Sequence, residues 1–296
     1  MPAESQTAVV TDSTAYLPEQ TLVEHDIHTV SLYVTLDGDQ RAESEIGPVE
    51  YDDFYERLRR SADGATTSQP SVGDFLAVYE PLLAAGREVV SIHISAGISG
   101  TVESARQARQ QLIDSGRGGE RITVWDSRSG CGGQGLMTLA AARAAAAGAD
   151  AEQTMDRVER ARERLRMWFA IDTLEYLRRG GRIGSAQALL GSALQIKPIL
   201  TLEEEITPVE RVRTRRRAFE RMVEFARQRK EEGADAWVVQ HIHDPDTARK
   251  LVAECRQVFG CDPVFVSEIG PVIGAHIGPG LLGFGGVPSD CLDWPG

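Results

Sequence analysis

Short apolar segments rich in β-branched residues recur along the first half of this chain, and segments with helical spacing separate them. This alternation predicts βαβ units and a largely parallel sheet, because consecutive parallel strands need a crossover between them. The expected strands cover residues 7–13, 28–38, 88–95 and 121–127. The expected helices cover residues 49–61, 71–85, 99–114 and 134–147. The first half is therefore expected to be an α/β domain with a mostly parallel sheet and flanking helices.

A highly charged segment at residues 151–166 has the composition of a solvated connecting helix and marks a domain boundary. Beyond it, strands are expected at residues 167–172, 196–202, 206–212, 236–242 and 263–269, and helices at 185–194, 214–231 and 246–258. The glycine-rich run at 270–286 is expected to form a loop and a returning strand without a regular helix, because glycine disfavours helices. The sequence thus predicts two α/β domains, residues 1–165 and 166–296, the second with a mixed sheet and helices.

The charge balance limits the partners of the chain. It carries 44 acidic and 32 basic residues, a net charge of −12, which argues against general binding to nucleic acid or to anionic membranes. The first residues lack a basic, apolar signal sequence, and no apolar run approaches the roughly 20 residues of a membrane helix. The four cysteines stand far apart and suggest neither a metal site nor a disulfide framework. We expect a cytoplasmic protein without a metal, a cofactor or stable membrane insertion.

A run of small residues, "SAGISGT" at 95–101, interrupts an expected strand and precedes an expected helix. The break predicts a strand-to-helix turn, with Ser99 or Thr101 as the N-cap. Such a turn directs several backbone N–H groups and the positive end of a helix dipole at one place. Small residues such as Gly100 let a ligand approach that backbone closely. Ser95, Ser99 and Gly100 are therefore candidate anion-binding residues.

Two further segments are candidates for the same site. The loop "ATTSQPSVGDF" at 65–75 places Ser71 and Asp74 as a capping box, and it offers more hydroxyls and amides than capping needs. It is either a turn rich in hydrogen bonds or a source of Thr67 for one ligand shared with the turn at 95–101. Hydroxyls and N–H groups without lysine suit a carboxylate better than a triphosphate. His276, flanked by glycines, is either structural or a donor to an oxyanion.

The same residues permit a second interpretation, a serine hydrolase or acyltransferase. Ser99 or Ser95 would be the nucleophile and His276 the base, with Asp12 or Asp126 as the third member. However, "GISGT" does not match G-x-S-x-G, so the turn lacks the register of a nucleophile elbow. The hydrolase interpretation is the weaker one.

Other polar residues have a structural and a functional explanation. Asp12, Asp126 and Asp172 each end an expected strand and precede a Ser or Thr, which fits helix caps as well as metal or phosphoryl chemistry. His241 and His243 are expected on one face of a strand, which alone is a weak metal signature.

Arginines gather in two places. Residues 211–217 hold five and residues 177–182 hold three. They form either a solvated face balanced by nearby glutamates or a docking surface for an acidic partner or a phosphorylated product.

Eight motifs occur in order between residues 11 and 283: "TDSTAYLP", "TTSQPSVGDF", "ISAGISGTVESAR", "VWDSRSGCGGQG", "IDTLEYLRRGGRIG", "IKPIL", "VRTRRRA" and "HIGPGLLG". Together they resemble the DegV family of bacterial fatty-acid-binding proteins, also called FakB. The resemblance implies two α/β domains enclosing one long-chain fatty acid, with the acyl tail in an apolar tunnel. It implies a carboxylate held by Thr67, Ser99 and His276, with the N–H of Gly100 as a further donor.

The resemblance also implies a carrier that is not itself an enzyme. In the kinase systems of this family, the bound fatty acid is presented to a separate ATP-dependent kinase and becomes an acyl-phosphate. An arginine of the C-terminal domain serves that encounter, which makes Arg178, Arg211 and Arg213 candidates for docking. Two departures from the family pattern, Ala96 and Val102, remove a hydroxyl and an aromatic ring beside the turn.

Overall fold

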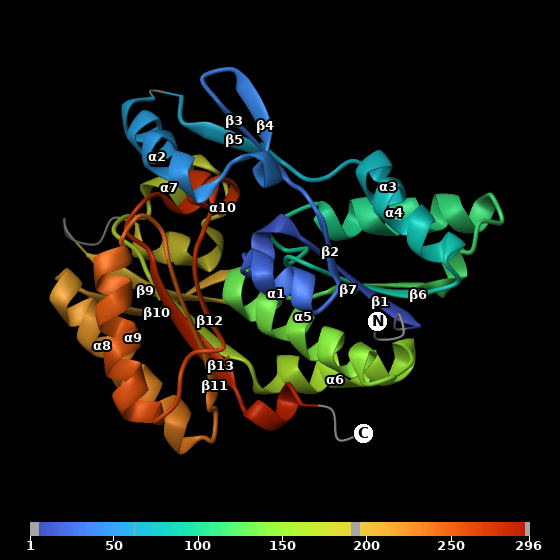
Figure 1. The fold of residues 1–296 in the computed structure, drawn as a ribbon. Helices are drawn as coiled ribbons and strands as arrows, with labels where there is room; N and C mark the ends of the chain where they lie inside the picture. Colours follow the sequence, from blue (N-terminus) through green and yellow to red (C-terminus); the bar gives the residue numbers. More distant parts are fainter. Residues whose placement is uncertain (1–5, 62, 191–195, 294–296) are drawn as a thin grey trace. The chain divides into compact units, whose positions relative to one another are not determined.

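The computed structural model describes residues 6–61, 63–190 and 196–293 (Figure 1). The chain divides into two compact units. Unit 1 comprises Met1–Ser31, Gln69–Leu165 and Val287–Gly296, and unit 2 comprises Leu32–Ser68 and Arg166–Gly286. The predicted α/β class is confirmed, with a parallel sheet and a mixed sheet. The units are not the contiguous halves 1–165 and 166–296, because two segments of the chain belong to the unit of the other half.

Unit 1 contains a four-stranded parallel sheet in the order β2-β1-β6-β7. Its elements are β1 (Thr7–Asp12), η1 (Ser13–Ala15), α1 (Glu19–Glu24), β2 (Ile27–Val30), α3 (Val72–Ala84), β6 (Glu88–His93), α4 (Thr101–Asp114), η4 (Gly119–Arg121), β7 (Ile122–Asp126), α5 (Cys131–Ala146), α6 (Ala151–Arg164) and η6 (Ser289–Cys291).

Side chains of β1 alternate between two covered faces, as the period of a strand requires. Ala8 and Val10 belong to an apolar cluster with residues of α3 and α4. Thr7 and Thr11 point the other way: Thr7 donates a hydrogen bond to the carbonyl of Ala149, and Thr11 receives one from Gln134 of α5. Every residue of β1 is consequently buried, which is typical of a parallel strand covered on both faces.

Unit 2 contains a six-stranded mixed sheet in the order β10-β9-β8-β13-β11-β12 and a three-stranded antiparallel sheet in the order β4-β3-β5. Its elements are β3 (Tyr33–Leu36), β4 (Asp39–Ala42), η2 (Glu43–Glu45), η3 (Pro48–Glu50), α2 (Tyr51–Arg60), β5 (Ala65–Ser68), β8 (Arg166–Ala170), α7 (Glu175–Arg179), η5 (Gly184–Leu189), β9 (Lys197–Leu202), β10 (Ile206–Val212), α8 (Arg215–Glu231), β11 (Ala236–His241), α9 (Pro245–Phe259), β12 (Phe265–Glu268), α10 (Pro271–Ile277) and β13 (Leu282–Val287).

The core of unit 2 lies between its large sheet and the helices α8 and α9, which run side by side (Figure 1). Trp168 of β8 stacks on Phe225 of α8 with ring centroids 3.9 Å apart, and Trp237 of β11 stacks on Phe259 of α9 at 5.5 Å. These aromatic pairs bury large apolar areas and fix the two helices on the sheet.

Several predicted elements differ from the structure. The first four residues of the loop expected at 65–75 form the strand β5. The single strand expected at 28–38 is two strands, β2 and β3, which join sheets of different units. The helix expected at 185–194 is the shorter 3₁₀ segment η5, and residues 191–195 lie outside the described residues.

The glycine-rich end holds a regular helix, α10, where the sequence predicted none. Contacts from η2 and α2 explain this difference. The buried Glu43 carboxylate accepts a hydrogen bond from the N–H of Val272 at 2.9 Å, and the Tyr55 hydroxyl donates to the carbonyl of Ile269 at 3.0 Å. Such tertiary contacts outweigh the poor helix propensity of glycine. The returning strand predicted after the loop is confirmed as β13.

Among the described helices, none combines the length and the apolar character that crossing a membrane requires.

Candidate functional site

The predicted strand-to-helix turn is confirmed, between the end of β6 and the start of α4. The carbonyl of Ser95 accepts hydrogen bonds from the N–H groups of Ile98 and Ser99, both at 3.1 Å. The N-cap residue is Gly100, so the prediction of Ser99 or Thr101 was wrong. The Ser99 hydroxyl nevertheless accepts a hydrogen bond from the N–H of Thr101 at 3.3 Å, and it lies 2.8 Å from the Thr101 hydroxyl. Ser99 therefore stabilises the turn one residue before the helix cap.

The predicted donors of this turn differ in exposure. Ser95 is fully buried, and its hydroxyl accepts a hydrogen bond from the N–H of Gly97 at 3.2 Å, so it supports the turn from inside. Ser99 and Gly100 are partly exposed. In the described part of the chain, no hydrogen bond uses the N–H of Gly100. Ser99 and Gly100 are thus the members of the turn that can donate to a ligand.

Gln69 lies against Gly100, which the sequence did not predict. A Cβ atom added to Gly100 would lie 2.8 Å from Nε2 of Gln69, so a side chain at this position would displace the amide. The only sequence signal was the position of Gln69 in the loop at 65–75. The Gln69 amide adds a neutral donor and acceptor beside the turn.

In unit 2, the structure brings two predicted residues together that are 209 positions apart. Thr67 Oγ1 of β5 lies 2.7 Å from Nε2 of His276, in the last turn of α10. The small sheet carries Thr67, and the packing of α2 and the small sheet on α10 places His276 opposite it. The pair belongs to unit 2 and the Ser95–Gly100 turn to unit 1.

The environment of His276 keeps its imidazole neutral. Burial, followed by the positive charge of Arg182, lowers the pKa of His276 to about 4. Its Nδ1 is buried and has no hydrogen-bond partner among the described residues. A proton on Nδ1 would leave a buried N–H without an acceptor, which is costly, so the proton belongs on Nε2. His276 Nε2–H then donates to Thr67, and the Thr67 hydroxyl keeps its own proton for an acceptor such as a carboxylate.

The arginine clusters are exposed but mostly paired. Arg178 forms a double hydrogen bond with Glu175, at 2.8 and 3.1 Å. Arg215 and Lys197 hold the carboxylate of Asp172, whose pKa they depress below its usual range although burial alone would raise it. Arg211 and Arg213 are exposed, and neither has an ion pair within the described residues.

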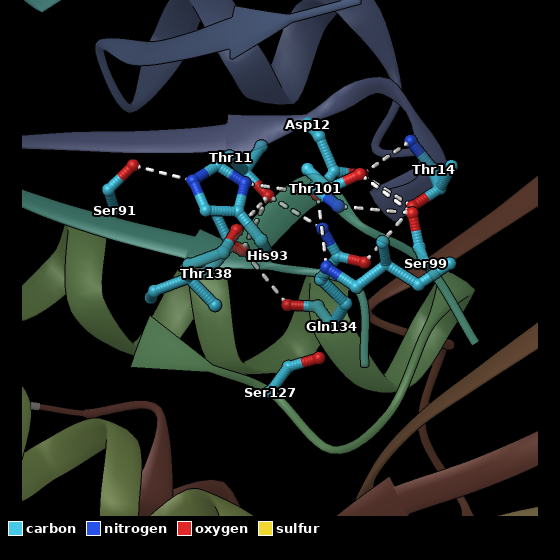
Figure 2. Close-up of polar contacts among 12 residues, drawn as sticks. Thr11, Asp12, Thr14, Ser91, His93, Ser99, Thr101, Ser127, Gln134 and Thr138 are labelled. Carbon is cyan, nitrogen blue, oxygen red and sulfur yellow. Dashed lines mark hydrogen bonds and ion pairs between the residues drawn. The ribbon is translucent and has the colours of Figure 1, made fainter. Parts of the chain in front are cut away.

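Asp12 and Asp126 have structural partners in unit 1. Asp12 accepts hydrogen bonds from Thr14 and from His93 (Figure 2). It also accepts one from the N–H of Ile94. Asp126 accepts from the N–H of Ala96 at 3.1 Å and of Arg128 at 2.8 Å. Among the described residues of unit 1, Ser91 is a serine paired with a histidine: its Oγ lies 2.7 Å from Nε2 of His93. His93 and Ser91 were missed by sequence reasoning, because their pattern is that of an ordinary buried strand.

His241 and His243 do not lie on one face of a strand as predicted. His241 is the last residue of β11, whereas His243 has a positive φ of 50° and pairs with Asp52 at 3.0 Å. Across residues 6–61, 63–190 and 196–293, no group of three or more His, Cys, Asp or Glu side chains is arranged to hold a metal ion.

Comparisons with known proteins match nearly the whole chain. A family model described as "Uncharacterised protein, DegV family" matches residues 6–289. Protein DegV of Bacillus subtilis is 37% identical over 281 residues, which cover 93% of this chain and 97% of that protein. A fatty-acid-binding DegV family protein from Thermus thermophilus superimposes with a TM-score of 0.84 at 35% identity, covering 95% of this chain and 99% of that one. A stearic-acid-binding protein from Eubacterium ventriosum gives a TM-score of 0.86 at 25% identity, covering 95% and 98%.

Proposed function

This chain belongs to the DegV family, and we propose that it binds one long-chain fatty acid as a carrier and not as an enzyme. Thr67, His276, Ser99 and the N–H of Gly100 hold the carboxylate, with Ser95 shaping the turn, and the acyl tail occupies an apolar tunnel. The Thermus thermophilus and Eubacterium ventriosum proteins, which bind fatty acids, share its fold and support this ligand class.

The observation that carries the proposal is the pair Thr67–His276, 2.7 Å apart. A neutral imidazole that donates to Thr67 turns the threonine hydroxyl into a directed donor. Neutral donors, without a metal or a paired lysine, suit a single carboxylate better than a phosphate chain. Burial of the acyl chain supplies the affinity, at roughly 0.8 kcal/mol per CH₂ group, and the polar groups orient the head group.

The first test is native mass spectrometry of the purified protein, followed by extraction and mass analysis of the released ligand. We expect one fatty acid per chain, with occupancy lost in Thr67→Ala and His276→Ala. Thr66→Ala is the matched control, because Thr66 is the exposed neighbour on the same strand. A wild-type protein that is empty and takes up no added stearic acid would contradict the proposal. Labelling of Ser99 by a fluorophosphonate would favour a hydrolase instead.

A double-mutant cycle tests whether both units hold the same carboxylate. Stearic acid affinity is measured for Thr67→Ala, Ser99→Ala and the double variant. Two groups that bind one carboxylate have non-additive effects, with a coupling energy of about 0.5–3 kcal/mol. Strict additivity would mean that Thr67 and Ser99 serve separate sites.

We further propose that the loaded protein presents its fatty acid to an ATP-dependent fatty acid kinase, which forms the acyl-phosphate. Because such a kinase uses cytoplasmic ATP, the proposal places the carrier in the cytoplasm. Arg211 and Arg213, exposed and without an ion pair in the described chain, are better placed to meet an acidic partner than Arg178, which would first have to leave Glu175.

Phosphate transfer from labelled ATP to the bound fatty acid, in the presence of a purified fatty acid kinase, tests this step. Arg213→Glu and Arg211→Glu should reduce transfer at least tenfold while stearic acid affinity stays unchanged. Arg249→Glu on α9 is the charge-matched control, since Arg249 is also exposed. Equal losses in all three variants would indicate a general charge effect and no docking surface.

A further inference from the structure

A row of buried polar side chains crosses the interior of unit 1 and ends beside the Ser95–Gly100 turn. The Tyr79 hydroxyl lies 2.7 Å from Ser91 Oγ, which lies 2.7 Å from His93 Nε2. The other ring nitrogen, Nδ1, lies 3.0 Å from Asp12 Oδ2 (Figure 2). All four side chains have an exposed fraction of 0%, so each group depends on its neighbour for a hydrogen bond.

The chemistry of the two ends sets the direction of every hydrogen bond in the row. At one end, the Asp12 carboxylate can only accept, so His93 Nδ1 carries a proton and donates it. At the other end, Ser91 is the hydrogen-bond partner of the Tyr79 hydroxyl within the described residues, so Tyr79 donates to Ser91. Ser91 then donates to the unprotonated Nε2 of His93. The row fixes one tautomer of His93 and satisfies all four groups.

Asp12 collects four donors on its two oxygens. Oδ1 accepts from the N–H and the hydroxyl of Thr14, and Oδ2 accepts from His93 and from the N–H of Ile94 at 3.0 Å. Burial alone would raise the pKa of the Asp12 carboxyl, but these hydrogen bonds outweigh it and hold the pKa below its usual value. Asp12 is therefore ionised, and it ties the end of β1 to the residue that precedes the turn.

We propose that Asp12 is a positioning residue for the head-group turn: oriented by the Tyr79–Ser91–His93 row, its carboxylate fixes Ile94 and thereby the start of the Ser95–Gly100 turn. The inference rests on the proposed function, because it assigns Asp12 to the carboxylate site without contact to the ligand. Ser95 follows Ile94 directly, and its carbonyl organises the turn through the N–H groups of Ile98 and Ser99.

Asp12→Asn is a sharp test because it keeps the shape of the side chain. In one orientation, the amide NH₂ would face the N–H and the hydroxyl of Thr14, and in the other it would face His93 Nδ1–H and the N–H of Ile94. In both cases a donor meets donors, and hydrogen bonds are lost. Asp150→Asn is the matched control, since Asp150 caps α6 at the surface and asparagine caps equally well. The measurements are stearic acid affinity, the ¹⁵N shifts of the His93 ring and hydrogen exchange of the Ile94 amide, with unfolding followed in parallel.

We expect Asp12→Asn to weaken stearic acid binding at least tenfold, to change the His93 ring shifts and to speed exchange at Ile94, while Asp150→Asn matches wild type. If Asp12→Asn does not fold, Ser91→Ala removes the donor to Nε2, and a mixed His93 tautomer with three- to fivefold weaker binding is expected. A folded Asp12→Asn or Ser91→Ala protein with unchanged His93 shifts and affinity would overturn the inference. If wild type binds no stearic acid, the proposed function fails, and Ile94 exchange still decides whether Asp12 fixes the turn.

Discussion

Gly180 lies in the arginine-rich segment 177–182, but its own role is to leave room for the side chain of His276. Its φ of −74° and ψ of −7° suit any residue, so local conformation does not require glycine there. A Cβ atom at this position would lie 2.2 Å from Nδ1 of His276, far inside van der Waals contact. The arginine-rich segment 177–182 therefore includes the surface against which the imidazole rests.

Gly180→Ala should destabilise the protein by about 1–3 kcal/mol, the usual cost of overpacking, and weaken stearic acid binding by displacing His276. Gly47→Ala is the control: Gly47 also has a negative φ, and the nearest atom to an added Cβ is 3.9 Å away. Urea unfolding and ligand titration of both variants check the prediction. A Gly180→Ala protein as stable and as active in binding as Gly47→Ala would contradict it.

His276 should make stability fall as the solution becomes acidic. Its pKa of about 4 in the folded chain lies below the ordinary 6.5, so between these values the unfolded state binds a proton that the folded state does not. The stabilisation is present above pH 6.5 and is lost as the pH falls towards 4, by on the order of 3 kcal/mol. Burial also lowers the pKa of His25, His28 and His241, so the comparison must be with His276→Gln. A smaller decrease in the free energy of unfolding in that variant, between pH 7 and 4.5, is the expected result.

At the scale of elements, α10 exists because other segments support its first turn. Its sequence contains an internal glycine and spans only Pro271–Ile277, too short to be stable alone. The Glu43 carboxylate accepts a hydrogen bond from the N–H of Val272. Gly274 leaves room for the Tyr55 hydroxyl, since a Cβ on Gly274 would lie 2.2 Å from the Tyr55 oxygen. The helix is thus a tertiary feature, and with it the position of His276.

Glu43→Ala should cost about 1–2 kcal/mol and loosen α10, because it removes the acceptor for a backbone N–H at the helix start. Glu45→Ala, at an exposed position of the same 3₁₀ segment, should change the free energy of unfolding by less than about 0.5 kcal/mol. Hydrogen exchange of the α10 amides separates local loosening from global destabilisation. Equal protection of α10 in the two variants would show that Glu43 is not its support.

Elements that depend on neighbouring residues in the sequence were predictable, and elements that depend on residues far away in the sequence were not. The predicted capping box of Ser71 and Asp74 is confirmed. It was predictable because both of its residues lie within one stretch of four residues. The strands of the parallel sheet were predictable for a similar reason, their β-branched apolar runs. By contrast, the break at Ser31–Leu32 has no local breaker residue, and α10 depends on residues more than 200 positions away. The same holds for Gly180 and His93, whose roles come from partners that a linear pattern does not reveal.

At the scale of the whole molecule, neither compact unit is a continuous piece of chain. Unit 1 lacks Leu32–Ser68 and includes Val287–Gly296, so the chain passes from one unit to the other four times. In unit 1, the terminal segment is fixed by Arg157, which donates to the carbonyl of Asp290 at 2.7 Å, and by the ion pair of Arg160 with the Asp290 carboxylate. The boundary predicted at residue 165 is one of these passages and does not separate two independent pieces.

A chain truncated to residues 1–165 should therefore not fold cooperatively, although residues 1–165 are the first domain predicted from the sequence. It would contain Leu32–Ser68 without the rest of unit 2, and unit 1 without its last segment. Urea unfolding followed by circular dichroism should show a broad transition, against a steep one for the full chain. A steep transition with near-native helix content would contradict this expectation.

The interleaved path also has a consequence for the order in which the protein is made. A ribosome completes residues 69–165 long before it reaches Val287, yet unit 1 needs that last segment to close. Unit 1 therefore stays incomplete while nearly all of unit 2 is synthesised. Unit 1 is complete only after Val287 and the residues that follow it are made, and a nascent chain of this kind depends on protection from aggregation until then.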